Sequence, residues 1–284
     1  MNGILIVDKP REWTSHDVVA KLRGVCHERR MGHSGTLDPL ATGVLAVFAG
    51  RATRAVEFAE ADEKEYIAGL RLGLSTNTQD VTGEVMSKSE ASVSESELEA
   101  VLDGFRGDIL QIPPMFSAVK INGQRLYALA RAGREVERRP RPVTISKLEI
   151  SGRENGDWVL DVVCSKGTYI RTLCADIGAA LGTGGCMSAL RRVRAGAFTI
   201  GMAHSIEEIA AGPEKYLLPT DTLYSEYGRL TVDGQSEKKL RCGADFAMDA
   251  PEGEYRFYST NGDFLMLGRV KNGRATTIKS FFEV

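Results

Sequence analysis

The chain has 284 residues, of which 43% are hydrophobic and 26% charged, a balance that indicates a folded protein with a substantial core. Its length allows one large domain with a smaller appendage, or two ordinary domains. No stretch approaches the apolar length of a membrane span, and the N-terminus lacks the basic region and cleavage site of a secretion signal. We therefore expect a cytoplasmic protein with no membrane partner.

The five cysteines and four histidines form no recognisable ligand set. The cysteines are scattered and include no CxxC pair, and the histidines show no HExxH or similar spacing. The sequence therefore predicts reduced thiols, no disulfide framework and no metal ion.

The net charge of −2 is unevenly distributed along the chain. Residues 84–108 contain seven acidic and two basic side chains, whereas residues 120–147 contain eight basic and two acidic ones. A basic lobe on a nearly neutral protein is compatible with one RNA-facing side, although a solvated charged loop gives the same pattern.

The first 50 residues predict a strand, a helix, a loop and a second strand. The apolar run 3–7 predicts a buried strand, and Thr14 or Ser15 caps a helix that we expect to run to about Arg29. A glycine-rich loop from Gly32 to Gly43 then leads into an apolar strand over 44–48.

The middle of the chain mixes strands and helices without a regular βαβ rhythm. We predict strands over 64–74 and 158–165, and Ser94 with Glu97 forms a capping box that opens a helix. A further helix follows the second of these strands, with Arg171 in its first turn if Thr168 is the N-cap. The basic segment 120–142 is expected to leave the compact core.

The end of the chain has a different pattern. After Leu223, short alternating runs are separated by Asn261-Gly262 and Asn272-Gly273, and Asn-Gly between such runs is a strong hairpin signal. The predicted fold class is therefore α+β, with a mixed, mostly antiparallel central sheet flanked by helices and a small all-β domain from about residue 225.

Segment 32–43, GHSGTLDPLATG, offers an aspartate from a shaped loop. Its glycines allow unusual backbone dihedrals, and Pro39 biases Asp38 toward an extended conformation. Catalytic groups concentrate in loops fixed on a scaffold, but an Asp-Pro pair is also an ordinary turn initiator. The residues alone leave both interpretations open.

Segment 32–45, GHSGTLDPLATGVL, closely resembles the catalytic motif of the bacterial tRNA pseudouridine-55 synthases, the TruB family. Segments 4–19, 64–83, 111–131, 166–178 and 187–192 are similar to further motifs of that family, in the same order along the chain. The resemblance implies a pseudouridine synthase fold over residues 1–224 with an RNA-binding insertion over about 117–142. It also implies a PUA-like RNA-binding domain over residues 225–284, where the match is less distinct.

The resemblance implies specific roles for residues at the motif positions. Asp38 corresponds to the family's nucleophilic aspartate, and Tyr66 and Arg171 to its active-site tyrosine and arginine; no cofactor is implied. His33 would fill the space left by an extruded base, and Leu190 would line the uridine pocket. The other residues expected to bind the T-stem-loop of tRNA are Lys9, Pro10, Asp80, Phe116, Lys120, Arg125, Tyr127 and Arg131. Phe116 stands where the family usually has tyrosine.

The implied reaction isomerises uridine 55 of the T-loop. It breaks the N1–C1′ bond, rotates the base and joins C5 to C1′, and the base must first be flipped out of the folded loop. Asp38 could attack the sugar, attack the pyrimidine ring or act as a base at C2′, and the sequence does not choose. Because the helix dipole disfavours a cation at a helix start, Arg171 suggests a nearby anion, and we predict an Asp38–Arg171 ion pair.

Three other functions fit part of the sequence. A non-catalytic tRNA-binding or tRNA-folding protein would be expected to have a damaged Asp38 motif, and the motif is intact. A guide-RNA-dependent rRNA pseudouridine synthase shares the motif, but the insertion in 111–142 and the compact length favour the stand-alone tRNA enzyme. A small-molecule enzyme would leave the basic insertion, which we expect to be mobile until tRNA binds, without a role.

Overall fold

The computed structural model describes residues 1–59, 63–90, 92–121 and 123–282. Its α-helices are α1 (Ser15–Val25), α2 (Val56–Ala59), α3 (Glu95–Leu102), α4 (Leu126–Arg131), α5 (Ile170–Ala180), α6 (Ile206–Ala211) and α7 (Gly234–Arg241). Short 3-10 turns are η1 (Gly50–Ala55), η2 (Asp103–Phe105), η3 (Ile200–Met202), η4 (Pro213–Tyr216) and η5 (Thr220–Tyr224). No helix in these ranges is long and apolar enough to cross a membrane.

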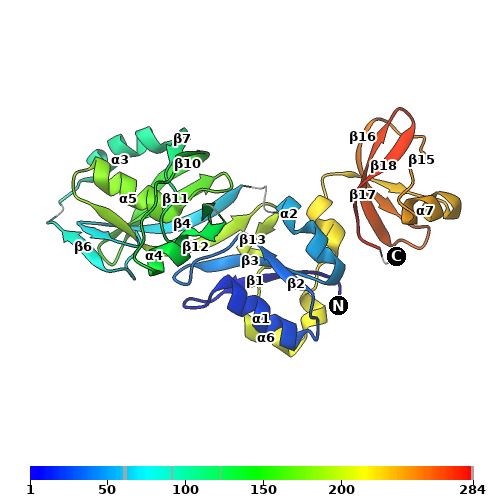
Figure 1. Ribbon diagram of the computed structural model, residues 1–284, viewed down its shortest axis with the longest axis horizontal. Coiled ribbons are helices and arrows are strands. Elements are labelled where there is room, and N and C mark those ends of the chain that lie inside the picture. The colour runs from blue at the N-terminus through cyan, green and yellow to red at the C-terminus, as the bar shows by residue number, and fades with distance from the viewer. Residues whose placement is uncertain (60–62, 91, 122, 283–284) are drawn as a thin grey trace.

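A large mixed sheet forms the centre of the molecule (Figure 1). Its strand order is β1 (Gly3–Lys9), β3 (Thr42–Ala49), β12 (Gly185–Ala195), β4 (Lys64–Leu72), β11 (Asp157–Cys164), β10 (Arg141–Glu154) and β7 (Gly107–Gln111), with β2 (Met31–Ser34) beside β3 and β13 (Phe198–Thr199) beside β12. Among the described strands of this sheet, only β3 and β12 pair in parallel, and the other neighbours are antiparallel. The predicted α+β class with a mixed, mostly antiparallel sheet is confirmed.

The two halves of this sheet are buried differently. On β1, Ile4 and Ile6 face one core with α2 and the C-terminal region, while Leu5 and Val7 face another with α1 and α6. Burial on both faces explains the continuous apolar run in the sequence. β4 and β11 instead alternate, and their inward residues pack under α3 and α5. The site described below lies where these halves meet.

Residues beyond 225 form a second, five-stranded sheet with its own core. Its order is β14 (Gly228–Thr231), β16 (Gly253–Tyr258), β17 (Phe264–Lys271), β18 (Arg274–Ser280) and β15 (Phe246–Ala247). The C-terminal β domain is thus confirmed, with helix α7 as an addition that the hairpin signals did not predict. Two small sheets complete the described strands: β5 (Leu74–Thr76) with β6 (Val85–Lys88), and β8 (Lys120–Ile121) with β9 (Gln124–Arg125).

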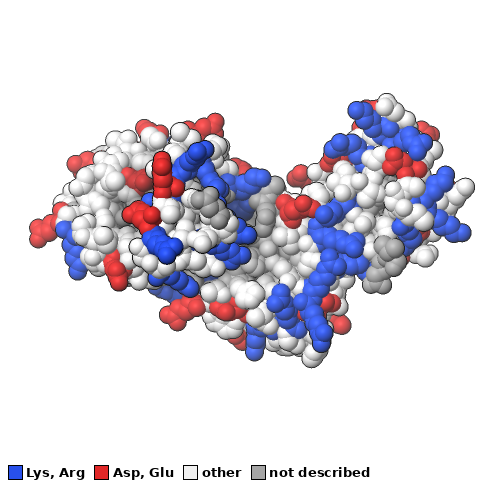
Figure 2. Space-filling view, viewed as in Figure 1, with Lys and Arg blue, Asp and Glu red and all other residues white. Residues whose placement is uncertain are grey.

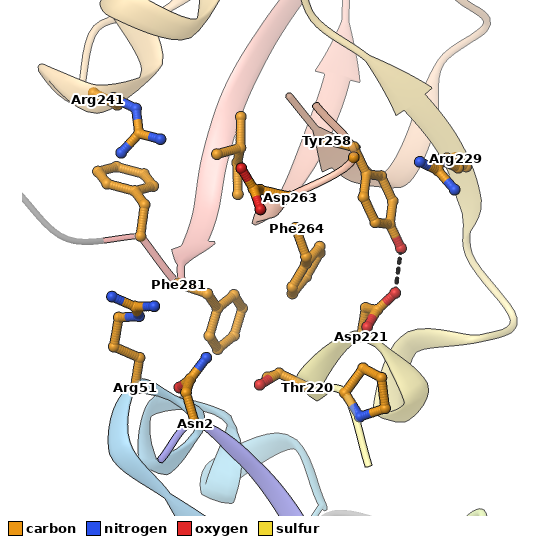
Figure 3. A pocket seen from close by; sticks show the side chains of 14 residues that line it. Asn2, Arg51, Thr220, Asp221, Arg229, Arg241, Tyr258, Asp263, Phe264 and Phe281 are labelled. Carbon is orange, nitrogen blue, oxygen red and sulfur yellow. Dashed lines mark hydrogen bonds between the residues drawn. The ribbon is translucent and has the colours of Figure 1, made fainter. Parts of the chain in front are cut away.

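The C-terminal domain lies at one end of the molecule, and a hollow separates it from the larger lobe (Figure 2). Lys and Arg side chains gather on both sides of this hollow. At the junction, Phe281 stacks on Phe264 with ring centroids 5.1 Å apart, and Tyr224 packs against both rings. A cleft of about 640 Å³ opens beside these rings between the C-terminal sheet and the N-terminal part of the chain (Figure 3).

Several predicted boundaries differ from the structure. Helix α1 ends at Val25 rather than about Arg29, because His27 adopts a left-handed φ of 49° that a helix cannot continue. The predicted loop 32–43 begins as strand β2, which pairs with β3. The predicted strand 64–74 is interrupted at Gly73, where φ is 79°.

Three further local predictions need correction. Thr168 is not the N-cap of α5, since its hydroxyl donates to the Ser165 carbonyl and Tyr169 occupies the cap position. The predicted excursion 120–142 is shorter, because Arg141 and Pro142 belong to β10. Asn272 and Gly273 both have positive φ, as a two-residue hairpin needs, whereas the turn at 261–262 is wider and is held by the Ser259 hydroxyl.

Candidate active site

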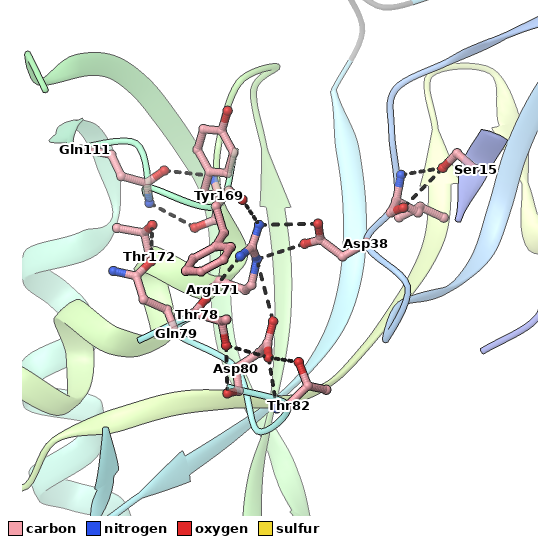
Figure 4. Close-up of polar contacts among 12 residues, drawn as sticks. Ser15, Asp38, Thr78, Gln79, Asp80, Thr82, Gln111, Tyr169, Arg171 and Thr172 are labelled. Atoms are coloured by element: carbon pink, nitrogen blue, oxygen red, sulfur yellow. Dashed lines mark hydrogen bonds and ion pairs between the residues drawn. The ribbon is translucent and has the colours of Figure 1, made fainter. Parts of the chain in front are cut away.

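Asp38 and Arg171 form an ion pair between the β2–β3 loop and the first turn of α5 (Figure 4). Arg171 Nε lies 2.9 Å from Asp38 Oδ2, and Arg171 Nη2 donates to Asp38 Oδ1 at 3.3 Å. The two-pronged contact fixes the orientation of the carboxylate as well as its position. The Arg171 side chain is only 6% exposed, whereas that of Asp38 is 37% exposed. The predicted ion pair is confirmed, and its aspartate is the member open to solvent.

Backbone carbonyls hold the Arg171 guanidinium from behind. Nη1 donates to the Thr78 carbonyl at 3.0 Å, and Nη2 donates to the Phe116 carbonyl at 2.8 Å. The buried arginine therefore has acceptors on several sides and is not free to follow Asp38 if the loop moves. Because Arg171 contacts only the backbone carbonyl of Phe116, a tyrosine at this position could accept the same hydrogen bond.

Asp80 lies behind the ion pair and is almost completely buried. One carboxylate oxygen accepts hydrogen bonds from the Thr78 hydroxyl at 2.9 Å and from the Thr82 amide at 2.9 Å, and the other lies 4.0 Å from Arg171 Nε. Asp80 was predicted to bind substrate. That contact stays a prediction; in this structure Asp80 stabilises the 78–82 turn, whose Thr78 carbonyl accepts a hydrogen bond from Arg171.

The loop that carries Asp38 is tied to the N-terminal region. The Ser15 hydroxyl accepts from the Leu37 amide at 2.8 Å, and the Glu12 amide donates to the Pro39 carbonyl at 2.7 Å. Lys9, whose side chain reaches the same loop, is 0% exposed. Its Nζ donates to the carbonyls of Pro10 at 2.9 Å, Trp13 at 2.5 Å and Pro39 at 3.5 Å.

Burial of Lys9 lowers its pKa to about 8, so the ammonium form that suits three carbonyl acceptors persists at neutral pH. The predicted contact of Lys9 with substrate stays a prediction; in this structure the side chain is buried and donates to three backbone carbonyls. Pro10 is half-buried and supplies one of the carbonyls. Both residues thus support the Asp38 loop in this structure.

Tyr66 and Leu190 form the apolar wall next to Asp38. Tyr66 lies on β4 and Leu190 on β12, and both belong to one buried cluster with Leu37 and Leu40 from the Asp38 loop. Burial raises the pKa of Tyr66, so its hydroxyl is protonated at neutral pH. The wall is therefore apolar in character with one hydroxyl available.

His33 lies on β2, half-buried and directly opposite Val47. Its Nδ1 is buried and has no hydrogen-bond partner among the described residues. Burial lowers the pKa of His33, and the nearby Arg192 lowers it further, so the ring is neutral at pH 7.

The basic segment extends from the site as a hairpin and a helix. Lys120, Arg125 and Arg131 are exposed, and the Arg125 and Arg131 guanidinium carbons lie 5.8 and 5.6 Å from the centre of the Tyr127 ring. Tyr127 thus packs within this segment, while the cations remain accessible to phosphate. Mobility of the segment without RNA stays a prediction.

The sequence is similar to those of known proteins along nearly its whole length. The protein family described as TruB family pseudouridylate synthase (N terminal domain) matches residues 23–170. The family described as tRNA pseudouridylate synthase B C-terminal domain matches residues 171–224. Proteins named tRNA pseudouridine synthase B from Streptomyces griseus and Clostridium perfringens are 41% and 42% identical to the chain. They align with 99% and 95% of it, covering 97% and 95% of their own lengths.

The chain belongs to the TruB family of pseudouridylate synthases.

Solved structures agree with the fold of this TruB-family enzyme. A crystal structure of a Cbf5-Nop10-Gar1 complex is similar with a TM-score of 0.75 and 26% identity, covering 99% of this chain and 85% of that one. A structure titled as an H/ACA RNP bound to a substrate RNA containing 2′-deoxyuridine has a TM-score of 0.74 at 24% identity, with the same coverage.

Two residues at the site, Gln111 and Arg192, were not predicted from the sequence. Gln111 ends β7 and joins the start of α5, since its side chain accepts from the Tyr169 amide at 2.7 Å and donates to the Tyr169 carbonyl at 3.1 Å. Arg192 lies buried beside Tyr66. Arg192 could have been predicted from strand geometry. Side chains two residues apart on a strand point to the same face of the sheet, so a strand that turns Leu190 inward also turns Arg192 inward.

Proposed function

We propose that this chain is a tRNA pseudouridine synthase that isomerises uridine 55 of the T-loop, with Asp38 as its essential carboxylate. The Asp38–Arg171 pair supports this proposal most strongly. A carboxylate that is part-exposed on one side and held in a two-pronged contact by a buried guanidinium on the other is oriented toward a ligand. Arg171 also places a positive charge beside the carboxylate, at 2.9 Å from its Oδ2.

The reaction moves one bond and one proton. The N1–C1′ bond breaks, C5 bonds to C1′, the proton leaves C5 and N1 gains one, so the product is an isomer of the substrate. Asp38 can serve as a nucleophile at the sugar, as a nucleophile at the ring or as a base at C2′. All three routes need an ionised carboxylate held within about 0.5 Å of its productive position, and the two-pronged contact with Arg171 restricts how the Asp38 carboxylate can turn.

The other residues around Asp38 suit a flipped uridine. Tyr66 offers an aromatic ring for stacking and a hydroxyl for proton transfer, and Leu190 offers an apolar wall. His33, neutral and half-buried on the neighbouring strand, is proposed to occupy the space that the extruded base leaves in the T-loop.

Positioning of the tRNA is assigned to surfaces outside the pocket. The exposed cations Lys120, Arg125 and Arg131 of the insertion 117–142 are proposed to contact backbone phosphates, which fix register without reading sequence. Residues 225–284 are proposed to act as a PUA-like RNA-binding domain beside the catalytic domain of residues 1–224. Basic side chains on both flanks of the hollow agree with an RNA partner that spans the two (Figure 2).

The relatives favour tRNA over guide-directed RNA. The chain is 41% identical over nearly its whole length to proteins named tRNA pseudouridine synthase B, and 26% identical to the Cbf5 complex structure. The test is to incubate the purified chain with an unmodified tRNA transcript and, separately, with a ribosomal RNA fragment without a guide. Pseudouridine mapped only to position 55 of the tRNA supports the proposal. Modification of the ribosomal fragment, or of another tRNA position, contradicts it.

A further inference from the structure

A buried arginine beneath the site has no role in the mechanism above. Arg192 lies on β12, is 1% exposed and is the largest fully buried side chain of the described residues. Removing a guanidinium from water costs several kcal/mol unless its donors are satisfied. In the part of the chain that the structure describes, its guanidinium donates to two backbone carbonyls and lies opposite Tyr66, and none of these groups is a carboxylate.

The two carbonyls lie at opposite ends of the loop that carries Asp38. Arg192 Nη2 donates to the Gly35 carbonyl at 2.9 Å, three residues before Asp38, and Nε donates to the Val44 carbonyl at 2.7 Å, six residues after it. The Arg192 guanidinium thus joins the two ends of the loop that carries Asp38. Because the guanidinium is planar, the spacing between the two ends is fixed by a single side chain.

The loop is shaped to approach this residue. Gly43 pairs in parallel with Arg192 at a φ of 99°, and a Cβ there would lie 2.2 Å from the Arg192 carbonyl oxygen. Gly35, at a φ of 68°, would place a Cβ 3.2 Å from Arg192 Nη1. Both glycines that flank the Asp38 segment are therefore required where the chain passes Arg192.

The third partner is the tyrosine on the other side of the pocket. Arg192 and Tyr66 are opposite each other in the β12–β4 register, and the positive charge of Arg192 lies close enough to the Tyr66 hydroxyl to oppose the rise of its pKa on burial. The guanidinium therefore links the loop that carries the carboxylate to the strand that carries the phenol. If this side chain only filled space in the core, an apolar side chain of similar volume would stabilise the fold better, because it has no charge to remove from water.

We propose that Arg192 is a positioning residue of the isomerisation, which holds the Asp38 loop and the Tyr66 hydroxyl in a fixed relation to each other. This inference rests on the proposed function, since it assigns the geometry of the same pocket. It concerns the rate of the chemical step and not the capture of tRNA, because Arg192 is buried and contacts no surface that RNA could reach.

The test compares Arg192→Lys, which keeps the charge but loses the fork, with Arg192→Met, which keeps the volume but loses the donors. Arg194→Gln is the matched control, because Arg194 lies on the same strand and pairs with Glu65 at 3.1 Å on the other side of the sheet. The measurements are the single-turnover rate at saturating enzyme, the tRNA dissociation constant and Tm. Both Arg192 variants are expected to react about 100-fold more slowly, with tRNA affinity changed by less than about threefold. Arg194→Gln is expected to keep the wild-type rate.

A double-mutant cycle with Tyr66→Phe separates positioning from general destabilisation. If Arg192 acts through the pocket, the combined variant loses less rate than the product of the two single losses. Losses that multiply, or that merely follow the unfolded fraction given by Tm, overturn the proposal. If Arg192→Met does not fold, Arg192→Lys assayed well below its Tm decides the question. Asp38→Asn is assayed alongside: if it keeps the wild-type rate, the proposed function fails, whereas an inactive Asp38→Asn beside a wild-type Arg192→Lys refutes only this inference.

Discussion

Arg171→Lys separates what the charge of Arg171 contributes from what its shape contributes. A lysine in this place keeps a cation near Asp38 but offers one nitrogen instead of three. The donors to the Thr78 and Phe116 carbonyls, at 3.0 and 2.8 Å in the native protein, cannot be replaced while the nitrogen also stays with Asp38.

The magnitude follows from those two carbonyls. Each buried acceptor left without a donor costs about 1–3 kcal/mol, so we expect a loss of at least about 2 kcal/mol in the free energy of unfolding. For a chain of this size about 2–4 °C of Tm corresponds to each kcal/mol, which predicts a fall in Tm of at least about 4 °C. The loss of the two-pronged contact should let Asp38 turn and slow the chemical step about 100-fold.

The assay is release of tritium from tRNA labelled at C5 of uridine, since C5 exchanges its hydrogen for a bond to C1′. It is run under single-turnover conditions together with thermal unfolding. Arg191→Lys is the control, because Arg191 pairs with Asp8 on the surface with both side chains more than a third exposed; exposed pairs contribute about 0–1 kcal/mol. A wild-type rate and Tm for Arg171→Lys would refute the reasoning, because charge alone would then suffice.

Three further predictions concern Lys9, Gln111 and His33. Lys9→Met leaves the Pro10, Trp13 and Pro39 carbonyls without their donor, so it should lower Tm and the single-turnover rate at unchanged tRNA affinity; a selective loss of affinity would show instead that Lys9 contacts RNA. Gln111→Leu removes both hydrogen bonds to Tyr169 and should destabilise the start of α5, seen as faster amide exchange there than in the wild type, and unchanged exchange would contradict this. Because burial lowers the pKa of His33 below its ordinary 6.5, the unfolded chain binds this proton first, and stability should fall as pH drops through 6.5 toward the folded pKa. His33→Gln should lose that part of the pH dependence in denaturant titrations, and an unchanged pH dependence would refute it.

Much of the fold could be predicted because the pattern of apolar residues in its strands shows which faces of each strand are buried. The run GILIV has no polar position because β1 is covered on both faces, and β11 alternates because only one face is covered. The predicted capping box at Ser94 and Glu97 forms both of its hydrogen bonds. Helix α7, by contrast, is rich in charged residues and contributes one fully buried side chain, Leu240, so it offers no apolar stripe to find.

The site was predicted less completely, since long-range contacts determine which side of a residue is used. Asp80 and Lys9 occur in motif positions next to the chemistry. In this structure, however, the Asp80 carboxylate accepts hydrogen bonds within the 78–82 turn, and the Lys9 ammonium donates to backbone carbonyls. Phe116 contributes a carbonyl rather than its ring to Arg171. No local sequence pattern distinguishes a side chain that contacts a ligand from a side chain that supports the loop carrying a catalytic residue. That difference arises only when β4, β12 and α5 come together.

We propose that the Asp38 carboxylate is essential for the isomerisation of uridine 55. The direct measurement compares wild type with Asp38→Asn, which keeps the size of the side chain and its place beside Arg171 but removes the charge. Each protein is incubated with unmodified tRNA, pseudouridine is mapped at single-nucleotide resolution, and tRNA binding is measured in parallel. We expect both proteins to bind tRNA and only wild type to form pseudouridine, at position 55. Pseudouridine at that position in the Asp38→Asn reaction, at a rate near that of wild type, would contradict it.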